Sequence, residues 1–139
     1  MNNKEEIKVV YTAHSKHNFY ARKMISAYVL NHNYLPLNPF TNWDYFLCDM
    51  VDRNLVVRAN NNLIYNSDEL WQFGEISDGC YNEIELAMNR NMKVRFFSVG
   101  KRIDDVHELD IDELEFEDEL KNKKDMSKFI NKIKDYKDC

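Results

Sequence analysis

Residues 77–87, SDGCYNEIELA, bring together side chains that could do chemistry. Ser77 and Gly79 are typical of a turn that opens a helix, and Asn82, Glu83 and Glu85 follow at once. The free N–H groups and the positive dipole end of a helix start suit an anion. We expect Glu83 in the first turn or so of this helix, where the dipole would keep a carboxylate ionised, as a nucleophile requires.

The periodicity of this helix leaves a second interpretation of Glu83 open. Ile84, Ala87 and Met88 mark the buried stripe, and Glu83 and Glu85 flank it on opposite sides. A first-turn glutamate commonly does no more than stabilise its own helix. On spacing alone, Glu83 is either a catalytic carboxylate or a solvated charge.

The other candidate motifs are weaker. His14 and His17 could bind a metal, but no Cys or Asp set with metal-ligand spacing accompanies them, so we predict no metal site and no cofactor. The sequence contains no glycine-rich dinucleotide motif and no P-loop motif. Cys80 lies near a helix start but lacks a clear base partner, so we interpret it as structural.

The elements that must position these residues alternate between strands and helices. Short apolar stretches predict strands at 7–13, 68–74 and 92–100, and residues 34–40 are extended and would supply a fourth strand near 34–37. Helical spacing covers 17–33, 43–65 and 79–91, with a break in the second near Asp52 or at 60–62. This order predicts an α/β fold: a small flavodoxin- or Rossmann-like parallel sheet of four to five strands, flanked by helices and followed by a C-terminal helical tail.

Such a sheet binds ligands beyond the carboxyl ends of its strands, near a switch in strand order. Two segments lie at such ends: YTAHSKH, residues 11–17, follows the first strand, and GEISDGCYNE, residues 74–83, follows the strand at 68–74. We therefore place the candidate site between these two segments.

The chain divides by charge into a body, residues 1–103, and a tail, residues 104–139. The body carries 12 Lys and Arg against 11 Asp and Glu, whereas the tail carries 7 against 13. No clustered basic face suggests binding to a nucleic-acid polymer, so a small-molecule substrate is the simpler expectation. The tail joins an acidic segment, residues 104–119, to an amphipathic helix at 123–138, whose apolar stripe packs on the body or on a partner subunit.

Composition indicates a folded protein of 139 residues, 44% of them hydrophobic and 13% aromatic. No apolar run approaches the roughly 20 residues needed to span a bilayer, and the start of the sequence has no signal-peptide pattern. The three cysteines, Cys48, Cys80 and Cys139, are odd in number and widely spaced, which suggests neither a disulfide framework nor a zinc site. We expect a reduced, cytoplasmic protein that does not contact membranes.

The chain resembles the nucleoside 2-deoxyribosyltransferase family and its relatives, the nucleoside 5′-monophosphate N-glycosidases. The resemblance rests on VVYTA around Tyr11, on SDGCYNEIELA with Ser77, Gly79, Glu83 and Ala87, and on the strand NMKVRFF that follows. It covers residues 7–99 and leaves the tail outside.

The resemblance implies cleavage of an N-glycosidic bond through a covalent intermediate. Glu83 would attack the anomeric carbon of a ribosyl or deoxyribosyl unit as the base departs, and water or a second base would then take the sugar. Tyr11 would donate a hydrogen bond to Glu83 and orient it, although Tyr11 is equally well interpreted as a core tyrosine. The residues implied to contact substrate are Ala13, His14, Ser15, Lys16, Ser77, Asp78 and Gly79.

Two positions depart from the family pattern. The family carries an aspartate about eight residues before the position of Asp68, and this chain has Asn60 there, which weakens the acid role. Ser77 replaces a carboxylate that binds the sugar 5′-hydroxyl, and a neutral hydroxyl at a helix start tolerates phosphate. The glycine-rich phosphate loop is replaced by HSKHN, so Ser15, Lys16 and Arg22 either bind the phosphate or form a solvated helix start.

These features leave two functions open. The chain is a nucleoside or nucleotide N-glycosidase or deoxyribosyltransferase, or it is a non-catalytic protein that binds a nucleotide or a nucleotide-derived signal in the same crevice. Glu83 with Tyr11 favours the enzyme, and Asn60 favours the binding protein. The resemblance and the apolar stripe of the tail also predict a homo-oligomer, most simply a two-fold dimer.

Overall fold

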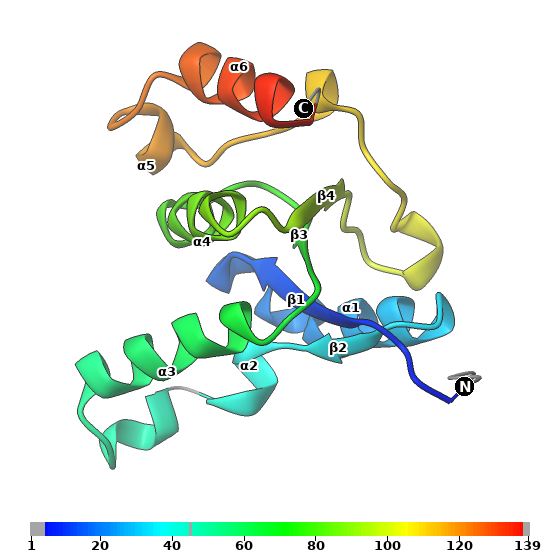
Figure 1. Ribbon diagram of the computed structural model, residues 1–139, viewed down its shortest axis with the longest axis vertical. Coiled ribbons are helices and arrows are strands. Elements are labelled where there is room, and N and C mark those ends of the chain that lie inside the picture. Colours follow the sequence, from blue (N-terminus) through cyan, green and yellow to red (C-terminus); the bar gives the residue numbers. More distant parts are fainter. Residues whose placement is uncertain (1–4, 45, 138–139) are drawn as a thin grey trace.

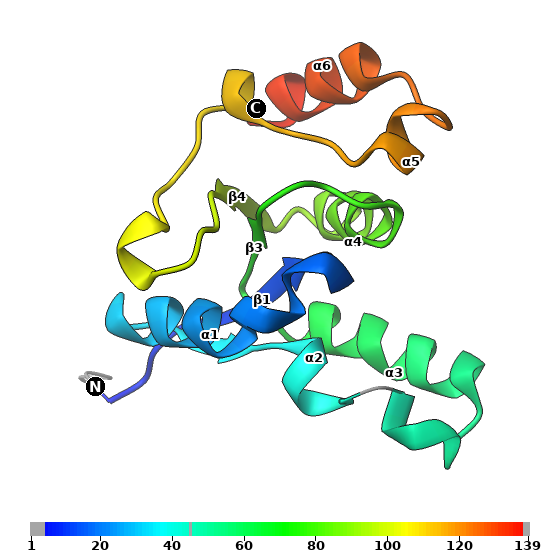
Figure 2. The same cartoon turned by 180° about the vertical axis from the view of Figure 1, so that it is seen from behind.

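The computed structural model of the chain describes residues 5–44 and 46–137. Its centre is a four-stranded, all-parallel sheet with helices on both faces (Figures 1 and 2), which confirms the predicted α/β class. The strands are β1 (Val9–His14), β2 (Leu35–Leu37), β3 (Glu69–Phe73) and β4 (Lys93–Phe97). Their order in the sheet is β2-β1-β3-β4. The chain therefore passes from β1 to β2 on one side of β1 and then crosses to β3 on its other side. The carboxyl ends of β1 and β3 therefore border the switch in strand order, where open α/β sheets bind ligands.

Alternation along the strands gives the sheet two apolar faces. One face packs Val10 and Trp71 against Ile25 and Val29 of α1 (Arg22–Asn31). The other face, which includes Tyr11, packs against α3 (Arg53–Tyr65) and α4 (Asp78–Asn89). Tyr11 therefore points toward the two helices that also carry Asn60 and Glu83, because neighbouring strand residues point to opposite faces.

The segment between β2 and α3 differs from its prediction. Residues 34–40 are not extended throughout, because α2 (Pro39–Asn42) begins at Pro39. Asn38 caps this short helix by accepting a hydrogen bond from the Phe40 N–H at 2.9 Å, and proline is well tolerated at a first helical position. The helix predicted over 43–65 is present only from Arg53, where Asp52 caps α3 at the predicted break. The first part of that prediction is wrong, because residues 46–49 form a 3-10 turn, η2 (Phe46–Asp49), with positive φ values. The alternative break at 60–62 is absent, since α3 runs through those residues.

The segment after β1 is η1 (Lys16–Ala21), a 3-10 helix that leads directly into α1. Gly74 shapes the turn after β3 with a φ of 78°, a conformation that favours glycine. A side chain there would also collide with Asn18, whose Nδ2 lies 2.5 Å from the position of an added Cβ. The segments that follow β1 and β3, which border the switch point, are thus packed against each other.

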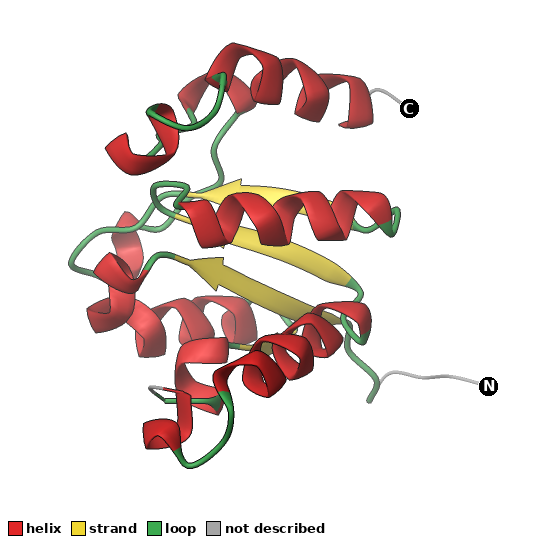
Figure 3. Ribbon diagram, turned by 90° about the vertical axis from the view of Figure 1, so that its left-hand side faces the viewer, coloured by secondary structure: helices red, strands yellow, loops and turns green. Residues whose placement is uncertain are grey.

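The tail wraps around the body and contributes to both cores. It contains η3 (Ile103–Asp105), η4 (Ile111–Glu113), α5 (Asp118–Lys121) and α6 (Met126–Lys137). Val106 packs with the α1 face, whereas Leu120, Phe129 and Ile133 are buried in the core beside α4. Figures 1 and 3 show α6 alongside α4, on the side away from α3.

The tail stripe therefore packs on its own body, which decides between the two placements that the sequence left open. This packing removes the tail stripe as a reason to expect a dimer, and the dimer stays a prediction. Cys139 lies outside the described residues, and within them Cys48 and Cys80 are free thiols. Among the helices of the described residues, none has the length and apolar character needed to cross a membrane.

The two edge strands end the sheet in different ways. On β2, Leu35 N donates to Lys8 O at 2.8 Å, so the neighbouring position, Pro36, presents its nitrogen away from β1 and carries no N–H. On β4, the tail runs along the edge: Leu109 N donates to Phe96 O at 2.8 Å, and Ser98 N donates to His107 O at 2.9 Å.

Candidate active site

Three side chains from three elements meet between α3 and α4, above β1. The Tyr11 hydroxyl donates a hydrogen bond to Glu83 Oε2. Asn60 Nδ2 donates to both of the others, to Tyr11 Oη at 2.7 Å and to Glu83 Oε2 at 3.0 Å. The structure thus brings together the three residues predicted to be catalytic, and the expected hydrogen bond from Tyr11 to Glu83 is present.

Glu83 lies slightly deeper in its helix than the first turn or so that the sequence suggested. The helix begins at Asp78 after the Ser77 cap, which places Glu83 in the second turn, beyond the range where the helix dipole acts strongly. The predicted stabilisation of the ionised form by the dipole is therefore wrong. Burial dominates and raises the pKa of Glu83 to about 7, while the hydrogen bonds from Tyr11 and Asn60 act in the opposite direction.

The two carboxylate oxygens of Glu83 have different surroundings. Both hydrogen bonds from Tyr11 and Asn60 reach Oε2, and no side chain among the described residues donates to Oε1. The residue remains partly exposed. Tyr11 is fully buried, and its burial and the neighbouring carboxylate hold the pKa of its hydroxyl well above the usual value, so Tyr11 remains a donor near neutral pH. The arrangement fixes one oxygen and leaves the other for chemistry.

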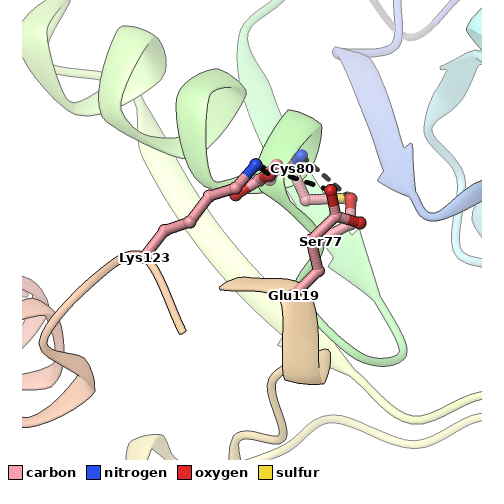
Figure 4. Close-up of polar contacts among 5 residues, drawn as sticks. Ser77, Cys80, Glu119 and Lys123 are labelled. Carbon is pink, nitrogen blue, oxygen red and sulfur yellow. Dashed lines mark hydrogen bonds and ion pairs between the residues drawn. The ribbon is translucent and has the colours of Figure 1, made fainter. Parts of the chain in front are cut away.

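The contacts of Glu85 distinguish it from Glu83. Glu85 Oε2 lies 2.7 Å from Lys132 Nζ in the tail, so this carboxylate forms a surface ion pair. At the start of the same helix, Ser77 Oγ accepts a hydrogen bond from Cys80 N at 3.2 Å, and Lys123 is paired with Glu119 (Figure 4). Glu85 is thus paired with the tail and makes no hydrogen bond to Tyr11, Asn60 or Glu83.

Three of the seven predicted binding residues, Ser77, Asp78 and Gly79, lie at the start of α4. Ser77 caps the helix, and Asp78 Oδ2 lies 2.5 Å from Lys123 Nζ. A Cβ added at Gly79 would find only Ser77 Oγ nearby, at 4.0 Å, so packing within the chain does not require glycine there. Burial raises the pKa of the Cys80 thiol to about 12, which keeps it neutral and agrees with a structural role.

The predicted binding residues at the end of β1 serve several structural purposes. Ala13 is buried in the core, and His14 is buried with its ring stacked on Phe40 at 4.5 Å between centroids. Burial lowers the pKa of His14. Ser15 accepts a hydrogen bond from His17 N at 3.2 Å, and Lys16 is exposed. None of these side chains donates to or accepts from the Tyr11, Asn60 and Glu83 cluster.

Sequence reasoning missed Trp43, which contacts the cluster from outside. Its indole Nε1 donates to Asn60 Oδ1 at 2.8 Å. Trp43 directly follows α2, and the Asn38–Pro39 pair, a helix cap followed by proline, was the signal that could have revealed this short helix.

A groove of about 630 Å³ opens elsewhere on the molecule, beside the β3–α4 loop. Its lining is largely acidic and comes from Glu75, His17 and residues of the tail between Leu114 and Lys121. Tyr11, Asn60 and Glu83 do not line it. The groove and the carboxylate cluster are separate features.

Comparison with known proteins identifies one family. No curated protein matches the chain. The model of a domain family described as a domain of unknown function, DUF7768, matches residues 7–97, which run from β1 to the end of β4 and include Tyr11, Trp43, Asn60 and Glu83. Because this match spans more than half of the 139 residues, the chain belongs to the DUF7768 family.

Proposed function

We propose that the protein cleaves the N-glycosidic bond of a nucleoside, a deoxynucleoside or a nucleoside 5′-monophosphate, by hydrolysis or base exchange, through a covalent glycosyl ester on Glu83. The observation that carries the proposal is Glu83, a partly exposed residue whose Oε2 accepts hydrogen bonds from Tyr11 and Asn60 while no described side chain donates to its Oε1. Glu83 contacts Tyr11 of β1, one of the two strands that border the switch in strand order, and such switch points bind ligands in open α/β sheets. The resemblance to nucleoside 2-deoxyribosyltransferases supports the same chemistry.

The reaction would proceed in two displacements at the anomeric carbon. Glu83 Oε1 forms a bond to C1′ as the C1′–N bond breaks, and the departing base keeps the electron pair and takes a proton from water. Water, or a second base, then attacks C1′, gives its proton to the hydroxide left by the first displacement, and releases the Glu83 carboxylate. Two inversions give net retention at the anomeric carbon.

The surroundings of Glu83 suit a nucleophile in two respects. Burial makes the carboxylate more basic than a solvated glutamate, and basicity favours bond formation. Tyr11 and Asn60 hold Oε2, so the carboxylate plane is fixed before substrate arrives. The two donors also stabilise the carboxylate when it leaves in the second displacement.

A phosphorylated substrate fits the first turn of α4 better than an unphosphorylated one. Ser77 presents a neutral hydroxyl at the start of a helix of 12 residues, where N–H groups favour a phosphate. The acidic residue of the first turn, Asp78, is paired with Lys123. The cytoplasm is the proposed compartment, because the free thiols of Cys48 and Cys80 fit a reducing environment.

The test is incubation with a panel of nucleosides and 5′-monophosphates, with free base measured by chromatography. Glu83→Gln should lower base release by at least about 1,000-fold, since it removes the nucleophile and keeps the shape. Glu85→Gln is the matched control, because it removes a carboxylate two residues away on the same helix and should retain activity. A folded Glu83→Gln protein with undiminished turnover would refute the mechanism.

A second function is favoured by Asn60 alone. Its carboxamide donates hydrogen bonds but cannot deliver a proton to a departing base, so the same cluster could hold a nucleotide without cleaving it. Calorimetric binding of a panel member, with no free base after prolonged incubation, would establish this binding function in place of the enzyme.

A further inference from the structure

We propose that Trp43 is a positioning residue for Glu83, acting through the side-chain amide of Asn60. For its catalytic consequence this inference rests on the proposed function, whereas its structural part concerns only Trp43, Asn60 and Glu83. Neither the family resemblance nor the sequence pattern assigns a role to Trp43.

The argument begins with the two ends of the Asn60 amide. An indole N–H is a donor and never an acceptor, so Oδ1 of Asn60 must face Trp43 Nε1, 2.8 Å away. The NH₂ group is then directed at Tyr11 Oη and Glu83 Oε2. If the amide were flipped, Asn60 Oδ1 would face the Glu83 carboxylate, which is an acceptor, and Asn60 Nδ2 would face Trp43 Nε1, which is a donor. Trp43 therefore selects the orientation in which Asn60 donates to Glu83.

The backbone before Trp43 is firmly anchored to the body. Asn38 is 3% exposed, and its Nδ2 donates to Arg22 O at 3.3 Å while its Oδ1 caps α2. Phe40 stacks on His14 at the end of β1, and Trp43 N donates to Pro39 O at 2.9 Å. The indole is thus held by a short helix that is fixed to β1 and to the start of α1.

Few other groups can set the proton affinity of Glu83. Tyr11 faces it from β1 and Cys80 lies nearby on α4, and burial keeps both of these neutral near pH 7. Asn60 from α3 is the remaining polar contact, and its hydrogen bond lowers the pKa of Glu83. Releasing the amide from Trp43 should therefore raise that pKa.

The experiment compares two tryptophan-to-phenylalanine variants. Trp43→Phe keeps an aromatic ring and removes the N–H, and the pKa of Glu83, followed through its carboxyl ¹³C shift by NMR, should rise by about one unit. Trp71→Phe is the matched control. Trp71, the other tryptophan of the chain, donates its N–H to Glu69 on the opposite face of the sheet, so its loss should leave Glu83 unchanged.

The wild-type protein supplies a second measurement that needs no folded variant. Its two indole N–H resonances can be observed directly, and the Trp43 resonance should shift with the same midpoint as Glu83, while the Trp71 resonance should not. A Trp43 resonance that ignores the titration of Glu83, or an unchanged Glu83 pKa in folded Trp43→Phe, overturns the inference.

These titrations use no substrate, so they are independent of the proposed reaction. A shifted pKa together with a wild-type protein that releases no base would refute the reaction and leave the positioning role in place. If base release is found, Trp43→Phe should also move the acid limb of its pH profile upward by the same shift, which a merely structural role would not do.

Discussion

Glu83 keeps its proton to a higher pH than a solvated glutamate, because its carboxylate is enclosed by α3, α4 and β1. The hydrogen bonds from Tyr11 and Asn60 offset only part of the solvation free energy that the carboxylate loses on burial. The residue is therefore a local cost to folding whenever it is ionised, a property common among catalytic side chains.

This cost predicts a pH-dependent stability. The pKa of Glu83 is about 7 in the folded protein against 4.5 in a solvated glutamate, so the folded state binds the proton more tightly. The resulting stability is present below about pH 4.5 and lost as pH rises through about 7. Glu83→Gln stays neutral and should exceed the wild type at pH 8 by roughly 1–3 kcal/mol in urea unfolding. A less stable variant at pH 8 would contradict this assignment.

The same pKa predicts the pH profile of the proposed reaction. Only ionised Glu83 can attack the sugar, so kcat/KM for base release should fall about tenfold per pH unit below about pH 7. Steady-state rates between pH 5 and 8 with one substrate check this, with circular dichroism to show that the fold persists. A profile that is flat from pH 5 to 7 would exclude Glu83 as the group that must lose a proton.

At the scale of elements, α4 carries both the Ser77 cap at its start and Glu83 of the candidate site in its second turn. Ser77 stabilises the helix by accepting from Cys80 N, and Asp78 in the next position is paired with Lys123 of the tail. Asp, Asn and Ser are similar helix caps, so position 77 can change charge with little change in stability.

This equivalence makes a test of phosphate binding. Ser77→Asp should raise KM for nucleoside monophosphates by about 10-fold or more and change KM for nucleosides much less, because only the phosphate is repelled. Ser77→Asn is a neutral cap of similar quality and should affect both substrates little. Equal effects of Ser77→Asp on both substrate classes would remove Ser77 from the phosphate site.

The elements also show how far sequence reasoning reaches. Apolar alternation and helical spacing predicted the strand that carries Tyr11 and the helix that carries Glu83, because these patterns are local. The contact between the two side chains was expected only from the family resemblance. Asn60 could be proposed only through the family resemblance, since nothing local distinguishes it from its neighbours in α3. Trp43 was missed because α2 has only four residues, too few for any periodicity. The pKa of Glu83 depends on packing between α3 and α4, which no local pattern encodes.

At the scale of the whole molecule, the tail is part of the core of the body. Ile133 is 1% exposed and belongs to the same cluster as Ile84 of α4. Ile133→Ala should destabilise the protein by about 2–4 kcal/mol, the range for a buried large-to-small change. Ile103→Ala, at a side chain that is 36% exposed, should cost less than about 1 kcal/mol. Equal denaturation midpoints for the two variants would show that the tail does not support the fold.

Assembly is the remaining prediction at this scale. The family resemblance predicts a homodimer, and light scattering of the full chain at micromolar concentration should give twice 16.7 kDa. Because the stripe of α6 is buried within its own chain, the interface should lie on the body. A mass of one chain would refute the dimer.

The two sheet edges have a consequence for how the folded protein meets its own copies. A strand that approached β2 would find Pro36, which has no amide hydrogen to offer, and a strand that approached β4 would find that edge already occupied by residues 107–109. Among the described residues, addition of a further strand is therefore disfavoured at both edges of the sheet. Edge-to-edge growth of the sheet into fibres of native molecules is disfavoured for the same reason.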